Sequence, residues 1–356
     1  MAILASIVFA SWVLLLGDLL NNTMIGGHVR GGTADWFLVR EAWMMGGEPY
    51  SSIASLAEKH LGWTPISQAT PHPRPPSALF LLGLLGLIPA TAPIWVWAAA
   101  SALGLTIWVQ CSTRWVGMSS LAELAVIPMA LMPPILQGVI WGTQMMVVAA
   151  AIGFTLLNWQ APRRRSSGIA LASALKLFPF LLAFAAKRGR GKTVLWTAGT
   201  LLLLSIGGLM LPGVDAADAF AAMSSAPDSY GAGRFNLSIN GVLAWPAASW
   251  LLPLGGLGLV LLLSRLIPER STIAVTLVVM VLLSPLAWPE YTVLWLPSLL
   301  LLWGDGRMLG KVAFVGLVGL VALARLEGSV LMFAGLALVG LIIWMTPRAS
   351  PPAPCA

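Results

Sequence analysis

The chain has 356 residues, of which 58% are hydrophobic and only 9% are charged. A soluble domain carries about 25% charged residues, so a surface of this size cannot be covered by 20 Lys and Arg with 13 Asp and Glu. These numbers exclude a soluble enzyme and a disordered chain. The net charge of +7 does not indicate nucleic-acid binding either, because it lies in short clusters beside apolar runs. The sequence predicts an all-α polytopic membrane protein.

Apolar runs of membrane-spanning length follow one another along the chain. A spanning helix needs about 20 mostly apolar residues. We interpret residues 1–20 as a retained anchor, because the run lacks a basic leader and a small-residue cleavage site. The later runs are 93–111, 121–136, 139–158, 193–211, 242–263, 272–286, 291–304, 311–325 and 329–346. Pro, Gly or Lys interrupts two shorter stretches, 77–89 and 168–186.

Clusters of Lys and Arg orient these runs, because basic loops stay on the cytoplasmic side. The strongest clusters are Arg163–Arg165 and Lys187–Lys192. All clusters can be cytoplasmic if each short stretch enters and leaves the membrane on one side. The sequence therefore predicts about ten crossings and two short or re-entrant helical hairpins in one integral-membrane domain, residues 1–346. The Pro- and Ala-rich tail, 347–356, is expected to be a disordered cytoplasmic segment.

Two long loops, 21–76 and 212–240, face the other side in this arrangement. Loops longer than about 12–15 residues are uncommon without a functional reason, so we expect the active site on this face. The pattern of apolar and charged residues over 31–44 predicts a short amphipathic helix lying in the membrane interface. The run Gly46-Gly47-Glu48-Pro49-Tyr50 would end that helix.

Three charged residues are the main candidates for chemistry. Asp35 is either an N-cap of the expected interfacial helix or a general base that faces a cavity. Arg74 is either an interfacial anchor or a clamp for phosphate. Lys176 lies within an apolar stretch, where its insertion costs about 2.5–3.5 kcal/mol. It needs a salt bridge or an anionic ligand, and we favour a lipid phosphate because acidic residues are few in the apolar segments.

Other polar and aromatic residues mark the same side of the membrane and are candidates for substrate binding. Each also has a structural interpretation, as part of the aromatic belt, as a helix cap or as a loop residue. The three histidines show no metal-ligand spacing, and the two cysteines lie far apart, so we expect neither a metal site nor a cofactor. The substrate-binding candidates are His72, Gln144, Arg234, Trp288, Glu290 and Tyr291.

Four motifs, taken in order, resemble one family. They are Asp35-Trp36-Phe37 with Gly46-Gly47-Glu48-Pro49-Tyr50; Pro75-Pro76 before a run that ends in Ile88-Pro89; Leu175-Lys176-Leu177-Phe178-Pro179 after an Arg-rich turn; and Ser284-Pro285 with Trp288. The chain resembles the polyprenol-phosphate-sugar-dependent membrane glycosyltransferases of the C-type superfamily. Within that superfamily it resembles glycosyltransferase family 87, which includes mycobacterial-type α-mannosyltransferases.

The resemblance implies a GT-C-like fold in the plasma membrane, with the active site on the periplasmic face. It implies metal-independent transfer of a monosaccharide, with mannose favoured, from a polyprenyl-phosphate donor to a lipid-linked or envelope glycan, with inversion. Asp35 would occupy the place of the catalytic base, and Arg74 and Lys176 would meet the donor phosphate. The residues fit this chemistry, since one carboxylate takes a proton and basic groups stabilise the leaving phosphate. A flippase of lipid-linked sugar and a non-catalytic envelope-assembly subunit remain as alternatives.

Overall fold

The computed structural model describes most of the chain, and four features expected from the sequence lie outside the described residues. These are the runs 1–20 and 121–136, the candidate Arg234 and the tail from residue 347. The described residues are 24–25, 28–29, 31–62, 71–89, 93–118, 138, 143–230, 236–243, 248–304, 307–323 and 327–346.

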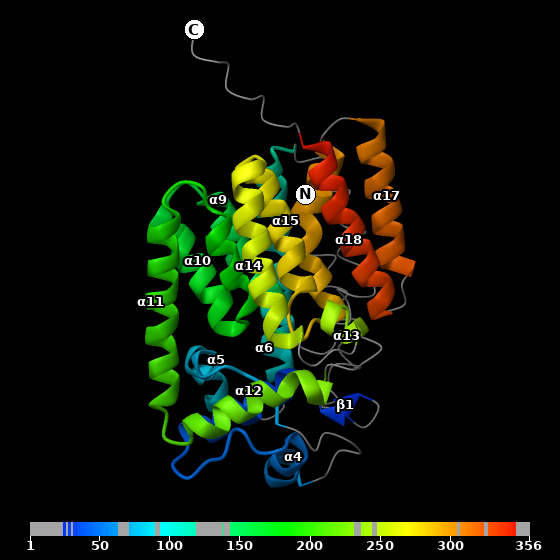
Figure 1. Ribbon diagram of the computed structural model, residues 1–356. Coiled ribbons are helices and arrows are strands. Elements are labelled where there is room, and N and C mark those ends of the chain that lie inside the picture. Colours follow the sequence, from blue (N-terminus) through cyan, green and yellow to red (C-terminus); the bar gives the residue numbers. More distant parts are fainter. Residues whose placement is uncertain are drawn as a thin grey trace.

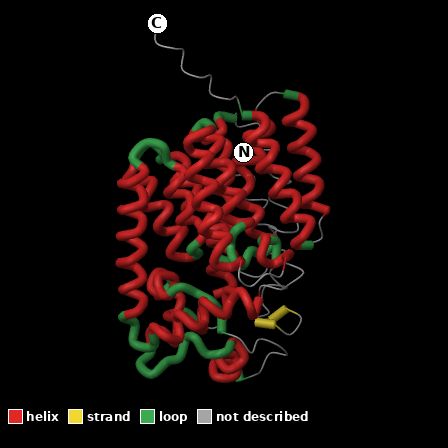
Figure 2. Tube along the Cα trace, in the orientation of Figure 1, coloured by secondary structure: helices red, strands yellow, loops and turns green. Residues whose placement is uncertain are grey.

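The described residues fold almost entirely into helices. The exception is a two-residue antiparallel ribbon, β1 (Met24–Ile25) with β2 (His28–Val29), drawn as a short yellow segment in Figure 2. Helices run side by side in a bundle, and further elements gather at one end of it (Figure 1). The bundle helices are α6 (Pro93–Val116), α9 (Met145–Leu157), α10 (Pro162–Leu175), α11 (Arg190–Leu209), α14 (Ala248–Leu266), α15 (Glu269–Leu282), α16 (Leu296–Gly304), α17 (Met308–Leu323) and α18 (Gly328–Met345).

The remaining elements lie either at one end of the bundle, here called the outer end, or nearer its interior. Those at the outer end are α3 (Gly31–Trp43), α4 (Ile53–Leu61), α5 (Pro76–Leu81), the 3-10 helix η1 (Gly83–Leu87) and α12 (Ala216–Tyr230). Two further 3-10 helices, η2 (Phe178–Ala185) and η3 (Pro289–Trp295), and the short α13 (Ile239–Leu243) lie nearer the bundle. Of the expected loop 212–240, residues 216–230 and 239 onward are therefore helical.

Two apolar cores hold these parts together. In the bundle, every residue of α15 from Ser271 to Leu282 is buried, and the Trp108 indole donates to the Val293 carbonyl at 2.8 Å. The outer core joins α3 and α4 to side chains from α5, η1, α6 and α12. The site described below lies where these two cores meet.

The surface of the bundle supports a membrane environment. Two of the described helices, α11 and α18, are long and apolar enough to cross a bilayer. Segments 145–157, 251–266 and 308–321 are apolar but shorter. Leu203 on α11 is 70% exposed, as expected for a side chain in contact with lipid rather than water. An all-helical membrane protein fits these findings, and the total of about ten crossings stays a prediction.

The interfacial helix expected near residue 31 exists as α3, but its expected one-sided exposure is wrong. Residues 33–39, Glu41 and Ala42 are all buried. The pattern misleads because partners from elsewhere in the chain enclose the polar side of the helix. Lys59 and His60 on α4 each contact Glu41 at 2.7 Å, so its carboxylate is neutralised without reaching water.

The stretch 168–186 begins earlier than its apolar pattern suggests. Helix α10 starts at Pro162, a favoured residue at the first helical position, and so takes up the basic cluster. Arg165 is consequently buried, and it donates to the carbonyls of Trp159 and Arg188. The helix ends at Leu175, Lys176 is extended, and η2 follows with Pro179 in its first turn. Whether this hairpin is re-entrant stays a prediction.

Gly208 permits a close contact between α11 and the start of α5. A Cβ on Gly208 would overlap the Pro76 carbonyl, whereas a Cβ on Gly199 of the same helix would meet nothing within 4 Å. We expect Gly208→Ala to destabilise the fold by about 1–3 kcal/mol through overpacking. Gly199→Ala should be neutral or stabilising by about 0.5–1 kcal/mol, because alanine favours a helix. Thermal unfolding of both variants in one detergent checks this, and equal midpoints would contradict it.

Candidate active site

Asp35 is the centre of a buried polar cluster. Its carboxylate is 1% exposed and accepts hydrogen bonds from Arg74 Nε at 2.6 Å and Nη2 at 3.4 Å. Gln144, the N-cap residue of α9, donates to Oδ2 through Nε2 at 3.0 Å. The N-cap alternative for Asp35 is therefore wrong, because the residue lies inside α3 and its recorded side-chain partners come from distant parts of the chain.

His72 lies at the edge of this cluster. Its Nε2 is 3.4 Å from Asp35 Oδ1, longer than a normal N–H···O hydrogen bond. Burial and the positive charge of Arg74 lower the pKa of His72 to about 4, so the imidazole is neutral at pH 7. Burial alone would raise the pKa of Asp35, but the charge of Arg74 and the contact with His72 outweigh it and hold the pKa below its usual value. Asp35 is thus a carboxylate neutralised by Arg74.

Local backbone contacts fix the position of Arg74. The Tyr50 hydroxyl donates to the Arg74 carbonyl at 3.0 Å, which gives the Gly-Gly-Glu-Pro-Tyr motif a structural role. Pro75 is extended and precedes Pro76, which starts α5. The Ser77 hydroxyl then donates to the Ala174 carbonyl at 2.9 Å, near the end of α10. This bond ties the segment that carries Arg74 to the segment that carries Lys176.

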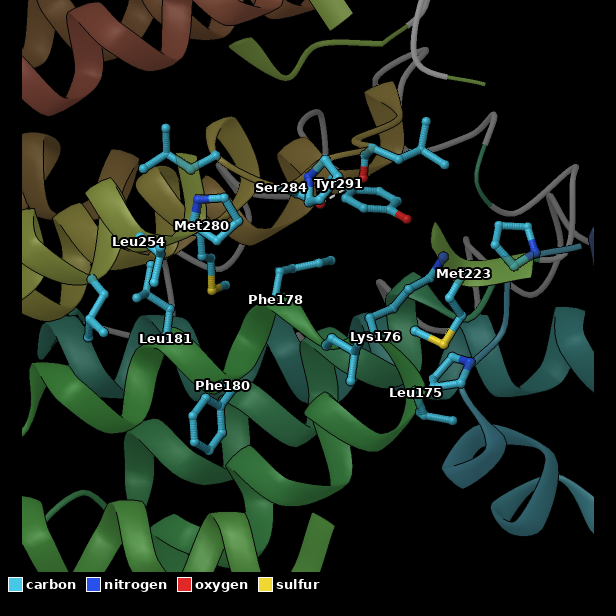
Figure 3. Close-up of a pocket in the computed structure, with 18 of the residues that line it drawn as sticks. Leu175, Lys176, Phe178, Phe180, Leu181, Met223, Leu254, Met280, Ser284 and Tyr291 are labelled. Carbon is cyan, nitrogen blue, oxygen red and sulfur yellow. Dashed lines mark hydrogen bonds between the residues drawn. The ribbon is translucent and has the colours of Figure 1, made fainter. Parts of the chain in front are cut away.

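Lys176 faces an apolar cavity from the break between α10 and η2. Its Nζ lies 5.3 Å from the centre of the Tyr291 ring, and Figure 3 shows the two side chains approaching from different walls. Within the described part of the chain, no carboxylate oxygen lies within ion-pair distance of Nζ. Burial and the charges of Arg74 and Lys176 lower the pKa of His72, so both cations act on the same imidazole.

The cavity has a volume of about 720 Å³, within the range of ligand pockets. Phe178 stacks on Tyr291 with ring centres 5.3 Å apart, beside the Lys176 end. Leu181, Leu254 and Met280 lie farther along the cavity in Figure 3. The walls come mainly from η2, α12, α14 and the segment 283–286 that follows α15, and the segment around Arg74 contributes Pro73 and Pro75. Phe220 of α12 lines the cavity and is 70% exposed, so α12 forms an outer rim.

The remaining substrate-binding candidates fall into different places. Tyr291 lines the cavity, while Glu290 is buried beside it in η3, with its Cβ close to Gly138. Trp288 packs against the bundle core and is not among the described residues that line the cavity. Gln144 and His72 join Asp35, as reported above. The described residues include no group of three or more His, Cys, Asp or Glu placed to hold a metal ion.

Sequence reasoning missed several contributors to the site. The apolar and small residues of α12 that border the cavity, Phe220, Met223 and Ser224, carry no chemical signal. Tyr50 could have been found, because it ends the Gly-Gly-Glu-Pro-Tyr motif, but the motif gives no partner for its hydroxyl. The Phe178–Tyr291 stack joins residues that are far apart in the sequence and share no pattern.

Comparison with protein-family models gives a match. No curated protein shows significant similarity to the chain. The matched family model begins at Arg74, and its range includes Gln144 and Lys176 and ends at Pro285. The family and the apolar helices together support a membrane protein. Because the model of glycosyltransferase family 87 matches residues 74–285, more than half of the 356 residues, the chain belongs to this family of glycosyltransferases.

Proposed function

We propose that the protein transfers a monosaccharide from a polyprenyl-phosphate donor to a lipid-linked or envelope glycan on the outer face of the plasma membrane. The observation that carries this proposal is the position of Lys176 at one end of an apolar cavity, with no carboxylate of the described residues within ion-pair distance. An anionic headgroup attached to a prenyl chain matches both features. Membership of a glycosyltransferase family supplies the reaction class, a sugar donor with an acceptor.

The parts of the donor have distinct partners in this proposal. The prenyl chain occupies the apolar cavity, whose walls are as apolar as the bilayer that the chain leaves. Lys176 and Arg74, rather than a metal ion, meet the phosphate, since guanidinium and ammonium groups are strong donors to phosphate oxygens. The sugar lies toward Gln144, His72 and Glu290, whose polar atoms suit hydroxyl groups. Mannose is the first sugar to test because of the resemblance to mannosyltransferases.

The reaction proceeds in one step with inversion. An acceptor hydroxyl attacks the anomeric carbon on the face opposite the phosphate, and the bond from that carbon to the phosphate oxygen breaks. Asp35 takes the hydroxyl proton as general base. The leaving group is a phosphate monoester, so it needs positive charge rather than a proton, and preorganised donors in a site of low dielectric constant stabilise it strongly.

A transfer assay tests the proposed function. The purified full chain in lipid nanodiscs receives farnesyl-phosphoryl-mannose as donor and octyl mannoside as acceptor, with glucose and arabinose donors in parallel. We expect transfer of one sugar, with an anomeric configuration in the product, read by NMR, opposite to that of the donor. Methyl-phosphoryl-mannose lacks the prenyl chain and should be a much poorer donor. Binding of every donor without transfer, together with movement of donor across a sealed vesicle membrane, would favour the flippase instead.

A further inference from the structure

We propose that the Arg74 guanidinium changes its ion-pair partner during the reaction, from the Asp35 carboxylate to the donor phosphate. One guanidinium thereby couples proton uptake by the base to departure of the leaving group. This inference rests on the proposed function and concerns the same site. The geometry of Asp35 is unfavourable for a general base. Asp35 is buried and already accepts three hydrogen bonds, two of them from Arg74, so in this state it has little capacity to take a proton.

Arg74 has donors to spare. Asp35 accepts from Nε and Nη2, and no described group accepts a hydrogen bond from Nη1. Both neighbours of Arg74, Pro73 and Pro75, line the cavity that Lys176 faces. The Tyr50 hydroxyl holds the Arg74 carbonyl, so the backbone that carries the guanidinium is fixed beside the cavity. A single guanidinium at this place can therefore serve a carboxylate on one side and a phosphate on the other.

The charges of the reaction require such an exchange. A bond forms between the acceptor oxygen and the anomeric carbon, and the bond from that carbon to the phosphate oxygen breaks, leaving its electron pair on the phosphate. The acceptor proton passes to Asp35. The phosphate thereby changes from a singly charged diester to a doubly charged monoester, while the carboxylate becomes neutral. One negative charge has moved from Asp35 to the phosphate, and arginine stays protonated throughout.

The single positive charge of Lys176 does not balance the two negative charges of the phosphate monoester that the reaction forms. This single charge at most matches the diester of the donor. His72 is neutral at pH 7, and the buried Glu290 carboxyl, which interacts with Lys176 and Arg74, adds no positive charge, so a second cation is needed as the monoester forms. Unpaired charges in a buried site are costly, and protonation of Asp35 leaves Arg74 without its partner. The new phosphate charge is then the natural partner for Arg74. Protonation of Asp35 and departure of the phosphate therefore favour each other.

Asp35→Asn tests the exchange, because a neutral amide resembles the protonated carboxyl. The ligands are farnesyl phosphate, a monoester that is mostly doubly charged at pH 8, and its methyl ester, which carries one charge. We expect the variant to bind farnesyl phosphate about tenfold more tightly than the wild type, since a close competing charge has gone. The affinity for the methyl ester should change much less. Calorimetry on the full chain in nanodiscs measures both, and Asp35→Asn with Arg74→Gln should lose the gain.

Glu41→Gln is the matched control, because Glu41 is equally buried on α3 but pairs with Lys59 and His60. It should leave both affinities unchanged. If Asp35→Asn binds farnesyl phosphate no more tightly than the wild type, Arg74 does not exchange partners and this inference is wrong. Loss of transfer in the same variant would still agree with Asp35 as the base. Transfer at the wild-type rate would instead remove Asp35 as the general base, whereas the proposed function itself fails only if the wild type shows no transfer.

A second measurement uses the wild type alone and covers the case in which Asp35→Asn does not fold. When farnesyl phosphate takes Arg74, the pKa of Asp35 rises, so binding should be accompanied by proton uptake. Calorimetry in buffers of different ionisation enthalpy measures this uptake, and the ³¹P shift reports whether the phosphate itself stays unprotonated. Lys176 and Glu290 interact with the same charges and can also take up a proton when an anion binds, so the uptake with the methyl ester, which leaves Arg74 on Asp35, is subtracted. Absence of additional uptake with farnesyl phosphate, or uptake by the phosphate itself, would overturn the exchange.

Discussion

Asp35→Asn is expected to lower kcat for sugar transfer by about a thousandfold. General base catalysis contributes about 10²–10⁴-fold, and in our mechanism the amide cannot accept the hydroxyl proton. The substitution keeps the shape of the side chain and a hydrogen-bond acceptor for Arg74, so the loss should appear in kcat rather than in KM for the donor. Initial rates with farnesyl-phosphoryl-mannose in nanodiscs measure the effect.

Glu41→Gln provides the comparison for that rate. Both carboxylates belong to α3, both are buried, and both are paired with cations from later in the chain, Arg74 in one case and Lys59 in the other. If the buried acids on α3 only stabilised the fold, the two variants would have similar transfer rates. We expect Glu41→Gln to keep transfer close to the wild-type rate. An Asp35→Asn rate that equals the Glu41→Gln rate would remove Asp35 from the mechanism.

Lys176→Gln is expected to lower kcat/KM for the donor by about a hundredfold. Removal of one preorganised donor to a developing anion costs about 10²–10³ in rate, and Lys176 is the cation that faces the cavity without a carboxylate partner among the described residues. Glutamine keeps most of the length and packing against Tyr291 but not the charge. Donor titrations at fixed acceptor separate the effects on KM and kcat.

Lys311→Gln is a matched control, since Lys311 Nζ also lies over an aromatic ring, 5.9 Å from the centre of Trp303. Lys311 is exposed on α17 and does not line the cavity. The loss of a cation–π contact is common to both variants, whereas only Lys176 belongs to the proposed phosphate site. Equal activity in the two variants would show that the charge of Lys176 is not used.

Particular residues show which features of the fold and the site could be predicted from the sequence alone. The apolar runs predicted most of the described long helices, because a run of that length has few other stable forms in a membrane. Asp35, Arg74 and Lys176 stood out because charges are scarce in this chain, but each had two interpretations. The choice of partner could not be predicted: Asp35 meets Arg74 and Gln144 across 39 and 109 positions of sequence, and such contacts depend on how helices pack.

The burial of α3 likewise shows that a sequence pattern predicts local structure but not the partners that pack against it. Its periodic pattern correctly predicted a helix, since spacing along one segment is local information. The pattern could not tell that Lys59 and His60 would neutralise Glu41, because these residues belong to another helix. Likewise, the break after Leu175 was foreseeable from Pro179, but the bond from Ser77 to Ala174 was not.

That bond has a consequence for how such enzymes can diversify. Ser77 and Ala174 join the backbone segments that carry the two cations, and Gly208 packs the start of α5 against α11. The spacing of the charges is thus set by backbone junctions, whereas the cavity walls come largely from side chains of η2, α12 and α14. Under the proposed function, substitutions in those walls would adapt the protein to donor lipids of different length or branching while the proposed site residues keep their positions. Selection can then act on lipid preference and on catalysis separately.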